Sequence, residues 1–166
     1  MLFRSGSYGA FAFDVTDSIT VGKPNVLRVK VDNRARPDVL PVNDYLFTIF
    51  GGLYRPASII LQDPVHVTAC DHASSGVVLE QTSLDGQHGR VDVTTRLRNA
   101  GPRAADVELR VNVTDAERRV VASEVRTIAL PPGPVRAEML SVDVPAPHRW
   151  HGRRDPYLYS FTVELQ

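Results

Sequence analysis

The sequence has little of what usually points to a partner or a compartment. One cysteine among 166 residues excludes an internal disulfide framework and suits a reducing compartment. The 19 lysines and arginines balance the 19 aspartates and glutamates, so no net field draws in nucleic acid or an anionic membrane. No apolar run approaches the ~18 residues of a membrane span. We therefore expect no nucleic-acid partner and no membrane segment.

The start of the chain lacks the signature of a secreted protein. The segment 1–6 has no basic start followed by an apolar stretch, so it does not predict a signal peptide. Together with the single cysteine, this favours a cytoplasmic location for the chain. If the chain is a piece of a longer protein, its sequence leaves the compartment of that protein open.

Convincing helical spacing is also missing, and strict alternation of apolar and polar residues takes its place. Alternation with a period of two places apolar side chains on one face of a strand that is half-buried against a second sheet. The fold class predicted is therefore all-β. The expected inward-facing sets are Val107, Leu109, Val111 and Val113; Val91, Val93 and Leu97; Leu140, Val142 and Val144; and Tyr157, Tyr159, Phe161, Val163 and Leu165.

Turn-forming residues separate these strands and divide the chain into two parts. Roughly seven strands over ~100 residues are typical of an immunoglobulin-like β-sandwich, which we expect over residues 63–166. The preceding part has strand-like segments at 8–17 and 25–32 and an irregular, proline-containing stretch from Asn33 to Asn43. About four strands are half of an eight-stranded jelly roll, so residues 1–62 are expected to form the C-terminal half of such a domain.

Five segments occur in an order that is more specific than any one of them. They are Gly51–Arg55, Asp63–Val67, Asn99–Gly101, Leu130–Gly133, and the stretch from Trp150 to Tyr159. In this order they resemble the non-catalytic front part of family-2 glycoside hydrolases, the group of β-galactosidases, β-glucuronidases and β-mannosidases. The resemblance covers essentially the whole chain and is closest to β-galactosidase-like members.

The resemblance implies a scaffold rather than a catalyst. Members of this family carry a jelly-roll sugar-binding domain, then an immunoglobulin-like sandwich, then a catalytic (β/α)8 barrel with two catalytic glutamates. The chain is expected to be a fragment without that barrel, whose parent hydrolyses O-glycosyl bonds in carbohydrate metabolism. Glu108, Glu138 and Glu164 alternate with apolar residues and are expected on the solvated surface. The barrel of the parent is the expected partner, and the sugar preference stays open.

The resemblance also implies an acidic sugar contact, and here the match fails. Family members have an aspartate five residues before the double glycine, whereas this chain has Leu46. A short loop shift would place Asp44 there, with Tyr45 and Phe47 as an aromatic face for a pyranose ring. The alternative is that these residues only close the jelly roll around its core.

Three residues are expected to have structural or docking roles. Trp150 is expected to close the bottom of the sandwich, with about 1.5 to 3 kcal/mol from burial. Asp155, followed by a proline, is expected to stiffen the turn into the last strand. Arg55 is expected to bridge the jelly roll and its neighbours by forked hydrogen bonds.

No metal or cofactor site is expected. The segments Cys70–His72 and His148–His151 contain metal-ligand residue types, but neither has a partner cluster, and structural zinc needs four nitrogen or sulfur ligands.

Two other functions remain open from the sequence. One is a free-standing carbohydrate-binding or adhesion module, and the other is a fibronectin-like structural repeat, although no internal repeat is present. Half a jelly roll would leave strand edges and apolar side chains unpaired, among them Phe11, Phe13 and Leu27. We therefore expect residues 1–62 to self-associate, swap strands or be poorly ordered.

Overall fold

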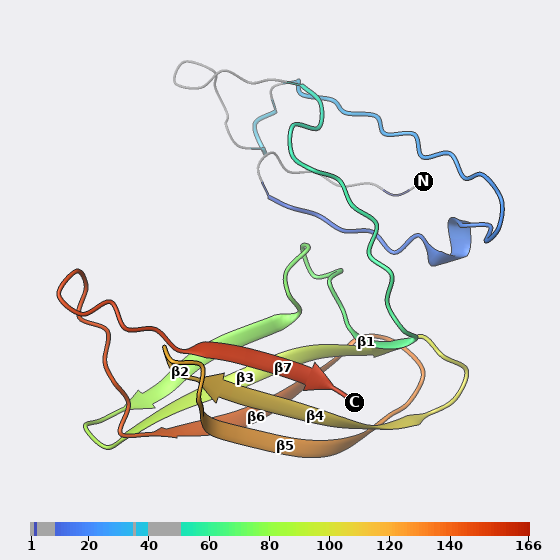
Figure 1. Ribbon diagram of the computed structural model, residues 1–166. Helices are drawn as coiled ribbons and strands as arrows, with labels where there is room; N and C mark the ends of the chain where they lie inside the picture. The colour runs from blue at the N-terminus through green and yellow to red at the C-terminus, as the bar shows by residue number, and fades with distance from the viewer. Residues whose placement is uncertain (1, 3–8, 35, 40–50) are drawn as a thin grey trace. The chain divides into compact units, whose positions relative to one another are not determined.

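The computed structural model describes residues 2, 9–34, 36–39 and 51–166, and it is all-β in these ranges (Figure 1). The chain divides into two compact units. The front unit comprises Met1–Leu61 and Cys70–Ala73, and the sandwich comprises Gln62–Ala69 and Ser74–Gln166. No helix among the described residues has the length and apolar character that crossing a bilayer would require.

The sandwich consists of two antiparallel sheets, as the sequence predicted. In the first sheet, β3 (His88–Asn99) pairs along one edge with β1 (Val65–Val67) and β2 (Val77–Leu84), and along the other with β6 (Arg136–Pro145). In the second sheet, β4 (Ala105–Thr114) lies between β5 (Val120–Leu130) and β7 (Ser160–Leu165). Figure 1 shows the two sheets stacked face to face.

The alternation in the sequence fixes which side chains fill the space between the sheets. Leu97 and Leu140 of the first sheet and Leu109 and Val111 of the second are completely buried. The sets expected on β4 and β6 belong to the core, as do Val93 and Leu97 of β3, while Val91 of β3 and Phe161, Val163 and Leu165 of β7 pack against it partly buried. The predicted faces of these strands are therefore confirmed, because a period of two leaves one side of each strand for the opposite sheet. Tyr157 and Tyr159, expected in the same strand as Phe161, lie before β7 begins, and only Tyr159 of the two packs against the core.

Asn99 joins two connections at one end of the sandwich. Its side chain is buried, and its amide nitrogen donates to the carbonyls of Arg103 and Leu130, at 2.8 Å each. Its amide oxygen accepts from the N–H of Gly101 at 2.8 Å, and its backbone carbonyl accepts from the N–H of Gly133 at 3.1 Å. One buried amide therefore fixes the β3–β4 and β5–β6 turns together.

Gly76 permits a close crossing where the chain enters β2. It has φ of +74°, and a Cβ there would lie 2.4 Å from the carbonyl oxygen of Thr68. The backbone N–H of Arg96 donates to the carbonyl of Gly76 at 2.8 Å. Both the positive φ and the contact require glycine at this position.

The front unit contains no strand among its described residues. Its described regular structure is a 3-10 helix, η1 (Thr16–Ser18), and the described parts of the two segments expected as strands, 9–17 and 25–32, contain no strand. That part of the prediction is wrong, for a physical reason: alternation identifies a strand-like sequence, but a strand needs a partner to satisfy its backbone. Leu27 is 80% exposed and Val29 is 54% exposed.

Candidate functional site

The connection between β6 and β7 carries the densest set of aromatic and charged contacts in the sandwich. We call residues 146–159 the β6–β7 loop. It leaves β6 through Ala146, which has a positive φ of 41° and whose N–H donates to the carbonyl of Gln87 at 2.6 Å. The loop is thereby tied at its base to the β2–β3 turn.

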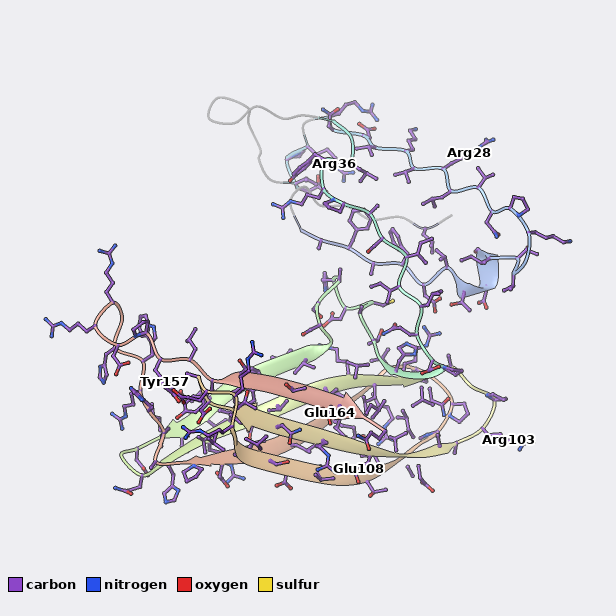
Figure 2. The ribbon with its side chains drawn as sticks, viewed as in Figure 1. Arg28, Arg36, Arg103, Glu108, Tyr157 and Glu164 are labelled. Atoms are coloured by element: carbon purple, nitrogen blue, oxygen red, sulfur yellow. The ribbon has the colours of Figure 1, made fainter. Side chains whose placement is uncertain are left out.

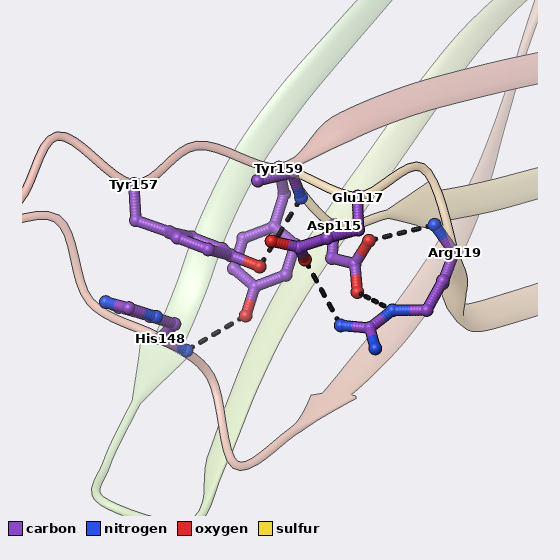
Figure 3. A network of polar contacts seen from close by, with 7 residues as sticks. Asp115, Glu117, Arg119, His148, Tyr157 and Tyr159 are labelled. Atoms are coloured by element: carbon purple, nitrogen blue, oxygen red, sulfur yellow. Dashed lines mark hydrogen bonds and ion pairs between the residues drawn. The ribbon is translucent and has the colours of Figure 1, made fainter.

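Stacked rings hold the two arms of this loop together. The ring of His148 lies on that of Tyr157, with centroids 4.0 Å apart and planes at 8°. Tyr157 meets Tyr159 edge to face at 5.2 Å. The backbone N–H of His148 donates to the hydroxyl of Tyr159 at 2.9 Å, as Figure 3 shows. Contacts of this kind contribute beyond their buried area, so the base of the loop is ordered by aromatic packing.

Asp155 closes the outer part of the loop. Its carboxylate lies 2.6 Å from Nε2 of His148, and its backbone carbonyl accepts from the N–H of His151 at 2.7 Å. Trp150 and Leu158, one in each arm of the loop, are 62% and 70% exposed. The loop therefore has a fixed base and presents apolar side chains to solvent.

The β4–β5 turn contacts the same base (Figure 3). The hydroxyl of Tyr157 accepts from the N–H of Ala116 at 3.4 Å. Beside it, Asp115 is buried, and its carboxylate accepts from the backbone N–H of Arg119 at 2.8 Å and from Nε of Arg119 at 2.7 Å. Burial alone would raise the pKa of Asp115, but these hydrogen bonds and the guanidinium charge hold it below its usual range.

Two of the three glutamates predicted for the surface form ion pairs. Glu108 lies 2.5 Å from Arg110, and Glu138 lies 2.8 Å from Arg136. Figure 2 places Glu108 on β4 and Glu164 near the end of β7. Within the described part of the chain, no three histidine, cysteine, aspartate or glutamate side chains gather as metal ligands would.

The three residues expected to contact sugar, Asp44, Tyr45 and Phe47, lie outside the described residues. Arg55 is exposed, and its guanidinium lies 5.7 Å from the centre of the Tyr54 ring. Its bridging role stays a prediction.

The structure corrects the role expected of Trp150. Because 62% of the residue is exposed, it does not close the bottom of the sandwich. The rings that pack at the base of the loop are those of His148, Tyr157 and Tyr159. The docking role of Trp150 and the turn-stiffening role of Asp155 stay predictions.

Sequence reasoning missed Asn99 and Asp115 as individual residues, although Asn99 lies in one of the segments it singled out. A buried asparagine or aspartate beside a turn is a weak signal, since most such residues are exposed turn formers. Only its long-range hydrogen-bond partners distinguish a buried residue of this kind from an exposed turn former. For Asn99 the decisive partner is the carbonyl of Leu130, 31 residues away.

The described residues of this part of the chain form an antiparallel β-sandwich with ion pairs along its strands and a projecting aromatic loop. The sequence profile of the Glycosyl hydrolases family 2 matches residues 77–166, from the first residue of β2 to the end of β7 and beyond to Gln166. The chain belongs to this family.

Its relatives include glycosidases from Bacteroides. A β-glucuronidase of Bacteroides fragilis is 35% identical over 163 residues, which are 96% of this chain and 23% of that protein. The crystal structure of a candidate β-galactosidase from B. fragilis has a TM-score of 0.76 at 36% identity, covering 81% of this chain and 20% of that one.

A second solved structure is similar to this chain over nearly its whole length. Bacteroides uniformis β-glucuronidase 2, solved covalently bound to a cyclophellitol-6-carboxylate aziridine, has a TM-score of 0.79 at 25% identity. The match covers 93% of this chain and 18% of that one. The chain thus spans about a fifth of the length of the relatives it matches.

Proposed function

We propose that this chain is a non-catalytic part of a family 2 glycoside hydrolase and that it scaffolds a catalytic barrel and its substrate pocket. The observation that carries the proposal is the family match over 77–166, which contains strands β2 to β7 of the sandwich, in a chain that spans about a fifth of its relatives. The parent's activity is then the hydrolysis of O-glycosyl bonds. The relatives named β-glucuronidase and β-galactosidase support that class of substrate and leave the choice of sugar open.

The carboxylates of the sandwich support a non-catalytic role. Retaining glycosidases use two carboxyl groups ~5 to 5.5 Å apart, one as acid and base and one as nucleophile. Glu108 and Glu138 are instead each paired with an arginine two residues along the same strand. These glutamates are therefore held by arginines of their own strands and are not arranged as a pair of facing carboxyl groups.

Two exposed surfaces are proposed to dock on the rest of the enzyme. One is the β6–β7 loop, which exposes Trp150 and Leu158 and also carries the exposed Arg153 and Arg154. The other is the front unit, which exposes apolar side chains along 26–31. Exposed aromatic and aliphatic side chains beside arginines are typical of the centres of interfaces.

Activity measurements on the purified chain test the proposal directly. We expect no hydrolysis of nitrophenyl β-glucuronide, β-galactoside or β-mannoside above the buffer rate. Titration with the free sugars, followed by NMR, tests sugar contact at Asp44, Tyr45 and Phe47. Turnover by the chain would contradict the scaffold role. Saturable shifts without turnover would support a free-standing carbohydrate-binding module instead.

A paired substitution tests docking. In the isolated chain, Trp150→Ala should leave the melting temperature unchanged, because the ring is mostly in solvent. In the full-length enzyme the same change should lower the melting temperature and the activity. Phe161→Ala, which removes a ring packed against the sandwich core, should destabilise both forms and serves as the control. Equal effects of Trp150→Ala in the two forms would rule out the docking role.

A further inference from the structure

Three of the strand edges in the sandwich are protected against pairing with another chain. Where the edges of β5 and β6 come together, Arg126 donates to the carbonyl of Met139 at 3.0 Å and Arg136 to that of Ala129 at 3.4 Å. The edge strand β2 carries an irregularity in register between Gln81 and Ser83. Covered carbonyls and bulges are devices that keep sheet edges from associating.

The outer edge of β7 has neither device. Glu108 and Gln166 exchange two backbone hydrogen bonds, at 2.9 and 3.0 Å. Along an antiparallel ladder, residue pairs that exchange backbone hydrogen bonds alternate with pairs that do not. In the register of β4 and β7, the pairs without backbone hydrogen bonds are Leu109–Leu165, Val111–Val163 and Val113–Phe161.

The N–H and C=O groups of Phe161, Val163 and Leu165 therefore point away from β4. No other strand among the described residues pairs with β7 on that side. The strand contains no proline, glycine or lysine that would block an approaching strand.

We propose that β7 pairs antiparallel with β7 of a second copy of this chain, with the two Val163 residues opposite each other. This register places Phe161 opposite Leu165 of the second copy, so that three residue pairs can each exchange two backbone hydrogen bonds. The two three-stranded sheets then become one continuous sheet. The core face also continues across the junction, since Phe161, Val163 and Leu165 all face the core.

The outer face of β7 favours a second copy as the occupant of this edge. In the proposed register, Thr162 lies opposite Glu164 of the other copy, in a pair without backbone hydrogen bonds where side chains come closest. Like charges are thus kept apart, and a hydroxyl faces a carboxylate. Two-fold symmetry repeats the arrangement, as a self-complementary interface requires. The inference does not depend on the glycosidase proposal, because it follows from strand register alone.

Two variants with opposite charges at residue 162 test the proposed register of the two β7 strands. By analytical ultracentrifugation of the full 166-residue chain, we expect a concentration-dependent dimer. Thr162→Glu places two like-charge pairs across the junction and should raise the dimer Kd roughly 2- to 30-fold. Thr162→Lys, the matched control, places opposite charges there and should leave the Kd unchanged or lower it.

Two further variants separate this interface from other modes of association. The N–H of Val163 is not used by β4, so Val163→Pro should abolish the dimer while the sandwich stays folded. Leu27→Asp tests association through the front unit and should leave the dimer intact. A chain that stays monomeric at ~100 µM would overturn the proposal and would point to a strand of the full-length protein as the occupant. Equal effects of Thr162→Glu and Thr162→Lys, or loss of the dimer only in Leu27→Asp, would also overturn it.

Discussion

The two units of this chain hold their polar groups in different ways. In the front unit, Asp14 binds Thr16 and Asp32 binds Arg34, each two residues away, and Asn25 binds Thr20, five residues away. In the sandwich, Ser141 donates to Asp92 across 49 residues. Local bonds can form in an extended segment, whereas long-range bonds need a folded core to bring the groups together.

The apolar residues follow the same division. Leu109 in the sandwich is fully buried, and Leu27 in the front unit is 80% exposed, although both alternate with polar neighbours. Periodicity in a sequence therefore states which residues would share a face. Whether that face is buried depends on a second sheet that packs against it. The difference between the two units shows that periodicity alone does not provide such a sheet.

Truncating these two leucines should give the largest contrast between the units. Leu109→Ala creates a cavity in a packed core and should lower the free energy of unfolding by about 3 kcal/mol. Leu27→Ala should change it by less than about 0.5 kcal/mol, because little contact is lost. Urea unfolding followed by circular dichroism measures both. Similar losses for the two variants would show that the front unit has a core of its own.

Removing the amide of Asn99 should have the next largest effect. Asn99→Ala leaves two carbonyls and one N–H without their partner and should cost about 2 to 3 kcal/mol in unfolding free energy. Asn112 accepts one hydrogen bond from Ser123 on the adjacent strand and provides the control, since Asn112→Ala should cost less than about 1 kcal/mol. Equal costs would mean that the amide of Asn99 does not join the two turns.

A small gain in stability is expected from Thr95→Val. Thr95 is fully buried on β3, and its hydroxyl has no hydrogen-bond partner. Valine has nearly the same shape without the unsatisfied group, so the free energy of unfolding should rise by about 1 kcal/mol. Thr94→Val, on the opposite face of the same strand, should not produce this gain. A loss of stability in Thr95→Val would indicate that the hydroxyl is satisfied.

The smallest expected effect is on stability in acid, and it should again differ between the two units. Arg34 holds the pKa of Asp32 down to about 2, and Arg119 helps to keep the pKa of Asp115 below its usual range. A lowered pKa contributes stability above the unfolded value of ~3.9, which is lost as pH falls through the folded value. Asp115→Asn should therefore make the unfolding of the sandwich less dependent on pH below about 4.

Asp32→Asn should leave that dependence unchanged, because its ion pair lies in the exposed front unit and not in the sandwich. Thermal melts between pH 2 and 5 give the comparison. A flatter acid profile for Asp32→Asn would show that the two units unfold as one.

Much of the sandwich could be predicted from the sequence, and the reason is geometric. The period of two in Val107–Val113 fixes one face of β4, and the residues 99–102 and 130–134 mark the turns. Contacts between residues far apart in the sequence produce no periodic pattern from which they could be predicted. The stack of His148 on Tyr157 and the bond from Asn99 to Leu130 depend on how the loops return to the sheets.

The errors have one cause in common. Trp150 was expected to be buried because it is large and aromatic, and strands were expected at 8–17 and 25–32 because they alternate. Both expectations assume that a side chain which prefers a buried position also occupies one. The environment in each case has to be supplied by another surface.

The exposed position of Trp150 has a practical consequence. It is the only tryptophan of the chain. Its indole emission should thus be that of a solvated ring in the isolated protein and should respond little to changes within the β-sheet core. Any surface that covers Trp150 in the β6–β7 loop should shift this emission to shorter wavelength, so the native chain carries its own optical reporter of assembly.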